Sequence, residues 1–102
     1  QAIGYTSQLT HVIALSLVNA SDYNENTKFA IGDSYKDLTR IAHINENLWS
    51  ELFIKNHEQL LKTIEHFEAS INEVKQAIKN QDEDALKKLM IKSTLRRSDL
   101  DE

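Results

Sequence analysis

One arginine stands out among the charged side chains because of the residues around it. Arg40 follows Asp37 by three residues, and both lie in the stretch Gly32-Asp33-Ser34-Tyr35-Lys36-Asp37-Leu38-Thr39-Arg40-Ile41-Ala42. A guanidinium has parallel N–H donors and a fixed charge, so it suits the binding of a carboxylate. A side chain of this type could in principle recognise an anionic group, and at this spacing on a helix Asp37 and Arg40 can touch.

A purely structural explanation competes with this one. Residues three apart on a helix are neighbours, so Asp37 and Arg40 could form an exposed ion pair of little energetic value. Ser34 and Asp37 also have the spacing of a capping box, in which the acid reaches back to the helix start. From spacing alone, a surface pair is the simpler interpretation of Arg40, and capping explains Asp37 as well as a role at a site does.

A second cluster lies near the N-terminus, where Ser7 and His11 are four residues apart and share a predicted helix face. From the residues alone, His11 is most simply a histidine at the edge of the core, bonded to a neighbour. The other histidines, His43, His57 and His66, have no metal-ligand spacing, and cysteine is absent. We therefore expect no metal site, no disulfide and no catalytic constellation.

The composition favours one all-α domain. The 102 residues contain no proline and two glycines, with 40% hydrophobic and 27% charged residues. The net charge of −4 argues against nucleic acid or an anionic membrane as a partner. The longest apolar run, residues 12–18, is too short to span a bilayer. The lack of cysteine fits a cytoplasmic protein.

Hydrophobic periodicity predicts about five or six helices. Asn45 and Asp82 are expected N-caps, residues 19–27 a polar connector and residues 98–102 a frayed tail. A short turn over 28–31 should stop at Gly32. The longer helices are expected over residues 6–19, 34–44, 46–55, 60–79 and from 83 onward. In the second, the apolar stripe consists of Tyr35, Leu38, Ile41 and Ala42; in the last, the marker residues are Ala85, Leu86, Leu89 and Met90.

The most regular pattern in the chain is a seam of apolar residues at alternating four- and three-residue steps. Its members are Leu60, Ile64, Phe67, Ile71, Val74 and Ile78. Such a heptad pattern predicts packing against other helices, in the same chain or in a partner. A seam this long in so short a chain favours a homodimer.

The residues around Arg40 resemble the C-terminal helical domain of prephenate dehydrogenases. The resemblance rests on Gly-x-Ser-Tyr-Lys-Asp-Leu-Thr-Arg-Ile-Ala, followed by Asn45-x-x-Leu48-Trp49-x-x-Leu52-Phe53-x-x-Asn56. Upstream, Ser7-Gln8-Leu9-Thr10-His11 is similar to the Ser-His-Leu-Pro-His segment of that family. The similarity extends from about Tyr5 to near Asn80.

The resemblance implies a fold, an activity and a cofactor. Prephenate dehydrogenases oxidise and decarboxylate prephenate to 4-hydroxyphenylpyruvate with NAD, in tyrosine biosynthesis. Their N-terminal Rossmann domain binds NAD, and their C-terminal helical domain serves dimerisation and substrate binding. By this resemblance, residues 1–102 are a single C-terminal domain that begins inside a longer gene and has no catalytic residue of its own. The isolated chain should be dimeric and inactive.

The implied substrate-binding residues are Arg40, His11, Ser7, Gln8, Asp37 and Trp49. Arg40 would hold a prephenate carboxylate, and His11 would line the same pocket, with Ser7 a turn away. Trp49 would lie near the mouth of the site, in its own subunit or reaching it from the partner. Asp37 would orient Arg40 or cap its helix.

The chain departs from the family segment at Gln8, which replaces a histidine, and at Thr10, which replaces a proline. Glutamine donates and accepts hydrogen bonds but does not titrate near neutral pH. An acid–base or charge role at position 8 is therefore in doubt, and the choice between prephenate and arogenate as substrate stays open.

Two other functions compete. A non-catalytic helical interaction module would use the seam to recruit another protein and leave Arg40 on the surface. An all-α chorismate mutase would need several cations converging on one pocket, and Arg40 is a single candidate, so this hypothesis ranks last.

Overall fold

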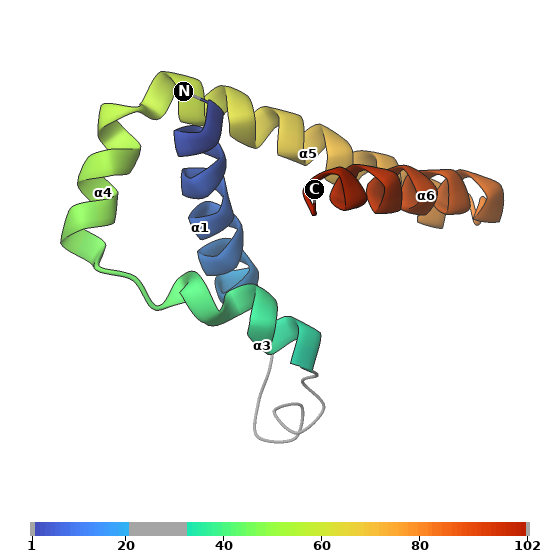
Figure 1. Ribbon diagram of the computed structural model, residues 1–102, viewed down its shortest axis with the longest axis horizontal. Coiled ribbons are helices and arrows are strands. Elements are labelled where there is room, and N and C mark those ends of the chain that lie inside the picture. The colour runs from blue at the N-terminus through green and yellow to red at the C-terminus, as the bar shows by residue number, and fades with distance from the viewer. Residues whose placement is uncertain (1, 21–32, 102) are drawn as a thin grey trace. The chain divides into compact units, whose positions relative to one another are not determined.

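The computed structural model describes residues 2–20 and 33–101, with side chains from Ser7 onward. These residues form five α-helices, one short 3₁₀-helix and no strand, so the prediction of an all-α chain is confirmed. The elements are α1 Ala2–Ala20, α3 Asp33–Thr39, η1 Arg40–Ala42, α4 Glu46–Lys55, α5 His57–Lys79 and α6 Glu83–Asp99 (Figure 1). The predicted connector beyond Ala20 and the turn over 28–31 lie outside the described residues. Among the described helices, none has the length and apolar character needed to cross a membrane.

The chain forms two compact units, Gln1–Ile64 and Glu65–Glu102. In the first unit, α1 packs against α3 and η1. Ala14 of α1 is completely buried, and Leu60, at the start of α5, is 4% exposed. The other apolar side chains of α1 from Leu9 to Val18 are only partly buried, so α3 and η1 cover part of its broad apolar surface.

The predicted single helix over residues 34–44 is wrong at both ends. The α-helix begins at Asp33, so Ser34 lies inside the first turn and does not cap it. It ends at Thr39, where the chain tightens into η1. The Thr39 hydroxyl donates to the Tyr35 carbonyl at 2.7 Å, a back-bond of the kind that bends helices. In the predicted apolar stripe of this region, Leu38 is 57% exposed.

Helix α4 matches its predicted bounds and its predicted cap. The Asn45 side-chain oxygen accepts from the Leu48 amide at 3.0 Å. Between α4 and α5 a single residue, Asn56, interrupts the helical path. Its amide donates to the Leu52 carbonyl and its carbonyl accepts from the Leu60 amide, so backbone bonds run through the joint.

In the second unit, α5 and α6 are joined by a tight connection at the predicted break. Gln81 has a left-handed φ of 53°, its amide donates to Ile78, and the Asp82 amide donates to Ala77. This is the bonding pattern of a Schellman motif, which satisfies the last carbonyls of α5. Asp82 then caps α6 by accepting from the Ala85 amide at 3.0 Å, as predicted.

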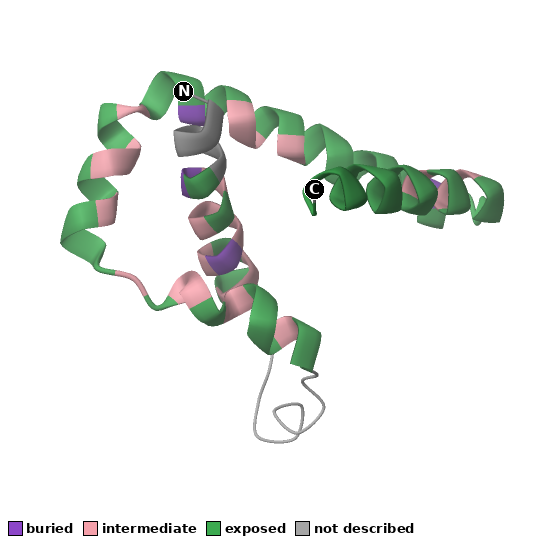
Figure 2. Ribbon diagram, in the orientation of Figure 1, coloured by how far each residue is buried: buried purple, intermediate pink, exposed green. Residues whose placement is uncertain are grey.

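Helix α6 extends further than the sequence predicts. Ser98 and Asp99 are helical, and Arg97 forms an ion pair with Asp101 at 2.6 Å, so the expectation of a frayed tail from residue 98 is wrong for its described part. Most of α6 and the adjoining part of α5 are exposed within the single chain (Figure 2). Ala85, Leu86 and Leu89 are partly buried against this unit, whereas Met90 is 62% exposed.

Candidate functional site

The two elements that carry the predicted anion-binding residues are in contact. Helix α1 carries Ser7, Gln8 and His11, and η1 begins at Arg40. Because α1 packs against η1 and α3, the fold brings the N-terminal cluster and the arginine segment into one structural unit. This juxtaposition joins residues that are separated by about thirty positions in the sequence.

His11 is held by two contacts, one at the edge of its ring and one on a face. Its Nδ1 lies 3.0 Å from the Ser7 carbonyl oxygen, which also accepts from the Thr10 hydroxyl at 2.6 Å. Because a carbonyl only accepts, Nδ1 carries the hydrogen in this contact and Nε2 is left for another partner. The exposed side chain of Ser7 takes no part, so Ser7 acts here through its main chain.

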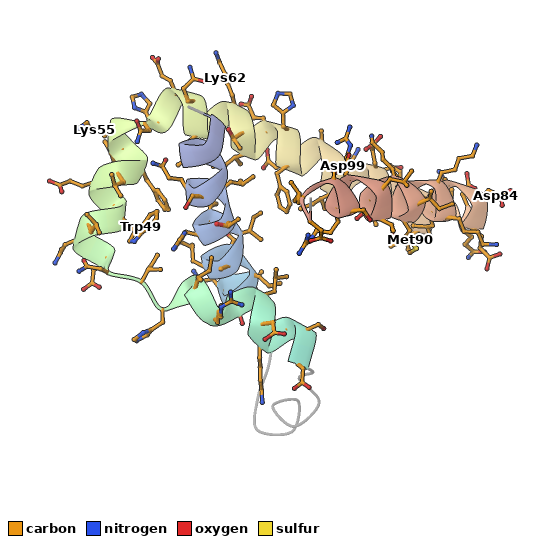
Figure 3. All side chains as sticks on the ribbon, in the orientation of Figure 1. Trp49, Lys55, Lys62, Asp84, Met90 and Asp99 are labelled. Carbon is orange, nitrogen blue, oxygen red and sulfur yellow. The ribbon has the colours of Figure 1, made fainter. Side chains whose placement is uncertain are left out.

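One face of the His11 ring is covered by Trp49. The two ring centroids are 3.9 Å apart and the planes are 20° from parallel, which is a stacked arrangement. Trp49 extends from α4 toward α1 (Figure 3). In the structure, the indole therefore meets the imidazole of its own chain.

Phe53 completes this aromatic group, in a role that the sequence analysis missed. Its ring lies edge-on to Trp49, with centroids 5.9 Å apart and planes at 65°. The four-residue spacing of Trp49 and Phe53 on one helix was the available signal. Trp49 therefore contacts two aromatic rings, His11 from α1 and Phe53 from its own helix.

Arg40 is exposed, and its Nη1 donates to the main-chain carbonyl of Asp37 at 3.2 Å. The Asp37 carboxylate forms no ion pair with Arg40. Among the described residues, the side chains that form an ion pair are those of Arg97 and Asp101. Asp37 therefore orients Arg40 through its backbone, and its own carboxylate points to no described partner of opposite charge. This arrangement leaves the outer edge of the guanidinium available to an anion.

Gln8 differs from its neighbours because it is buried. The residue is 8% exposed, and its Oε1 has no hydrogen-bond partner in the described part of the chain. Nearly all buried polar atoms in native proteins are paired, so this one calls for an explanation. Sequence reasoning selected the position from its departure from a family segment and had no signal for its burial.

Within residues 2–20 and 33–101, no three acidic or histidine side chains gather where they could hold a metal ion.

A groove of about 610 Å³ lies between α5 and α6 in the second unit, bordered by Val74, Leu89, Arg96 and Leu100. Arg96 lies in the last turn of α6, where its positive charge suits the helix dipole.

The chain was compared with curated proteins and with solved structures. It is 34% identical over 89 residues to a cyclohexadienyl dehydrogenase of Zymomonas mobilis, covering 82% of this chain and 30% of the relative. It is 30% identical over 87 residues to a prephenate dehydrogenase of Lactococcus lactis, covering 81% of this chain and 25% of the relative. A prephenate dehydrogenase of Bacillus subtilis is 26% identical over 85 residues, covering 78% and 23%. No solved structure matches significantly.

These relatives are longer, and the chain spans less than a third of each. A family model described as prephenate dehydrogenase, dimerization domain, matches residues 1–92, nearly the whole chain. The resemblance that the sequence motifs suggested is therefore confirmed, and the chain belongs to the prephenate dehydrogenase dimerization-domain family.

Proposed function

We propose that this chain is the dimerisation and substrate-binding part of a cytoplasmic, NAD-dependent prephenate dehydrogenase in tyrosine biosynthesis. The observation that carries the proposal is the packing of α1 against η1, because it joins His11 and Arg40 in one unit. Family membership supports the same reaction class. NAD would be bound by a separate domain and would accept the hydride.

Within this proposal, Arg40 binds a carboxylate of the substrate. Prephenate is a dianion, and removing its carboxylates from water without a cation would be costly. The guanidinium offers two parallel donors, and its bond to the Asp37 carbonyl limits the directions in which it can point. Asp37 is thus a positioning residue in the proposed site.

In this proposal, His11 and Trp49 line the same substrate site as Arg40. The imidazole presents Nε2 to the substrate, while Ser7 holds the opposite ring nitrogen. The Trp49 face keeps the ring from turning and excludes water from one side. The role of this pair is to bind and orient, with hydride transfer left to the cofactor domain.

The proposed partner is a second copy of the chain, through the seam on α5. Its members Ile71, Val74 and Ile78 are 50%, 40% and 59% exposed within the single chain. A row of large apolar side chains left in water on a long helix is typical of a helix–helix interface. Leu60, Ile64 and Phe67, the earlier members of the seam, are buried or partly buried.

The test is to replace Arg40 in the full-length protein and measure NADH formation with prephenate. Arg40→Ala should lower kcat/KM by about 30-fold or more, since losing a desolvated charged contact costs about 2–5 kcal/mol. Arg40→Lys should recover only part of the activity, because an ammonium cannot bind in a bidentate manner. Lys62→Ala, which removes an exposed positive charge from α5, serves as the matched control.

Two results would contradict the proposal. Full-length protein that does not turn over prephenate or arogenate would remove the enzyme assignment. Equal kinetics of Arg40→Ala and Lys62→Ala would leave the arginine without a role and favour a helical interaction module.

Arogenate is the second candidate substrate, and it is favoured by the name of the Zymomonas relative, which refers to cyclohexadienyl compounds and not to prephenate alone.

A further inference from the structure

Helix α6 has an exposed apolar stripe that is separate from the α5 seam. It consists of Ile91 and Leu95, which are 60% and 63% exposed within the single chain. They border a shallow groove of about 420 Å³ whose lining residues all belong to α6. The larger groove beside Val74 is lined by both α5 and α6 and contains neither of them. The α6 stripe therefore faces away from α5.

The spacing around the α6 stripe is that of a helix that packs against another helix. Lys88, Ile91, Leu95 and Ser98 follow one another at steps of three, four and three residues. This spacing keeps all four side chains on one side of the helix. The family model ends at residue 92, so Leu95 and Ser98 lie beyond the matched residues. The stripe is thus a feature of this chain that its family membership does not explain.

Two opposite charges flank the α6 stripe, one near each end. Lys88 and Asp99 are eleven residues apart, which is close to three helical turns, so both lie on the same side of the stripe. About 16 Å of helix separates them, so they do not reach each other within one chain. In the described part of the chain, neither takes part in an ion pair. Each is therefore available to a charge on another molecule.

We infer that the α6 stripe binds the same stripe of a second copy of the chain, with the two α6 helices antiparallel. A two-fold axis midway between Ile91 and Leu95 puts each Ile91 opposite the Leu95 of the other copy. The same axis brings each Lys88 to the Asp99 of the other copy, because the two positions are almost equally far from the axis. Each contact is made twice, so the surface is complementary to itself.

The charges select this orientation over the parallel one. In a parallel pair in register, Lys88 would lie beside Lys88 and Asp99 beside Asp99, and like charges repel. The antiparallel pair replaces both repulsions by attractions. Because this surface is distinct from the α5 seam, it would join two seam dimers into a larger assembly. The inference does not depend on the proposed enzymatic activity.

The experiment exchanges the two charges in the full-length protein and measures the average mass by light scattering over a concentration series. A single helix pair buries little surface, so the association is weak and appears as a rise in mass with concentration. Lys88→Glu and Asp99→Lys should each weaken it about 5-fold or more, since each puts like charges together twice. The double variant Lys88→Glu/Asp99→Lys should recover most of the loss. Recovery requires contact between copies, because the two positions are too far apart in one chain.

Lys87 provides the matched control. It is exposed and adjacent to Lys88 in sequence, but it lies on the other side of the α6 stripe from Asp99. The double variant Lys87→Glu/Asp99→Lys has the same net charge as the exchange and should not recover the association. Leu95→Glu, which puts a charge in the centre of the stripe, should weaken the association about 10-fold or more.

The outcomes separate the α6 stripe from the α5 seam and from the enzyme. In Ile71→Lys, which disrupts the seam, the α6 association should persist as a step from monomer to dimer. A mass that does not rise with concentration in the original protein or in Ile71→Lys would overturn the inference. A charge exchange that associates no better than its single variants, or no better than the Lys87 control, would do the same. Turnover measured by NADH formation tests the proposed function separately, and its absence would leave this inference standing.

Discussion

The imidazole of His11 lies flat against the indole of Trp49, with ring centroids 3.9 Å apart. The contact joins α1 to α4, two helices that are separated in sequence by α3 and η1. It also places the single tryptophan of the chain against a residue of the proposed site. Both stability and fluorescence should report on this pair.

The first prediction concerns the energy of the stack. In a double-mutant cycle of His11→Ala and Trp49→Ala, the two losses of stability should be non-additive by about 0.5–1.5 kcal/mol, the usual value for aromatic pairs. Urea unfolding of the two single variants and the double variant measures the coupling. The exposed His43 supplies the control, since His43→Ala should be additive with Trp49→Ala. Additive effects at His11 would show that the rings do not interact.

The second prediction concerns the fluorescence of Trp49. His11→Leu removes the imidazole from the indole face but keeps an apolar side chain there. The tryptophan emission should change in intensity or wavelength, because the group stacked on the chromophore has changed. His43→Leu should leave the emission as it is. Identical spectra for all three proteins would contradict the stacked arrangement.

The third prediction concerns the α5 seam. Ile71→Lys places a charge among apolar residues and should weaken the proposed dimer by about 10-fold or more. Glu65→Lys introduces the same residue on the same helix, at an exposed position that does not flank the seam, and should not. Light scattering over a concentration series measures the mass. If Ile71→Lys dimerises as well as the original chain, the interface lies elsewhere.

The fourth prediction concerns the connection between α5 and α6. Gln81 occupies a left-handed conformation that costs a side chain with a β-carbon about 1–2 kcal/mol. Gln81→Gly should therefore stabilise the protein by about 0.5–1 kcal/mol, after allowing for the extra freedom of glycine in the unfolded chain. Gln76→Gly, inside α5, should have the opposite sign, because glycine is a poor helix former. Thermal or urea unfolding compares the two variants.

The fifth prediction concerns the start of α6. Asp82→Ala removes the oxygen that accepts from the Ala85 amide and should cost about 1 kcal/mol. Asp82→Asn keeps an oxygen at that position and should recover most of the loss. Helix content by circular dichroism and the unfolding midpoint test this prediction. Equal stability of the alanine and asparagine variants would mean that the cap contributes nothing.

Local features of the fold were predictable from sequence because they depend on short-range rules. The caps at Asn45 and Asp82, and the break before Asp82, follow from side-chain chemistry within a few residues. The change to a 3₁₀ turn at Arg40 was not foreseen. It depends on a back-bond from Thr39 that competes with the regular helix.

The candidate site was predictable in its residue types and not in its contacts. The motif around Arg40 and the segment with His11 supplied the residues that we propose for the site. Periodicity, however, describes one helix at a time and contains no information on which helices meet. The stack of His11 on Trp49 and the burial of Gln8 arise from tertiary packing, so only the structure reveals them.

The 3₁₀-helix that begins at Arg40 affects how many hydrogen bonds the arginine can donate to an anion. In a 3₁₀ geometry, side chains three apart eclipse one another, which places Arg40 over the end of α3. Its guanidinium has five N–H groups, and one of them satisfies the Asp37 carbonyl. Four N–H groups remain, which is enough for bidentate hydrogen bonding to a carboxylate. The arginine can therefore be held in place by the Asp37 carbonyl and still bind an anionic ligand.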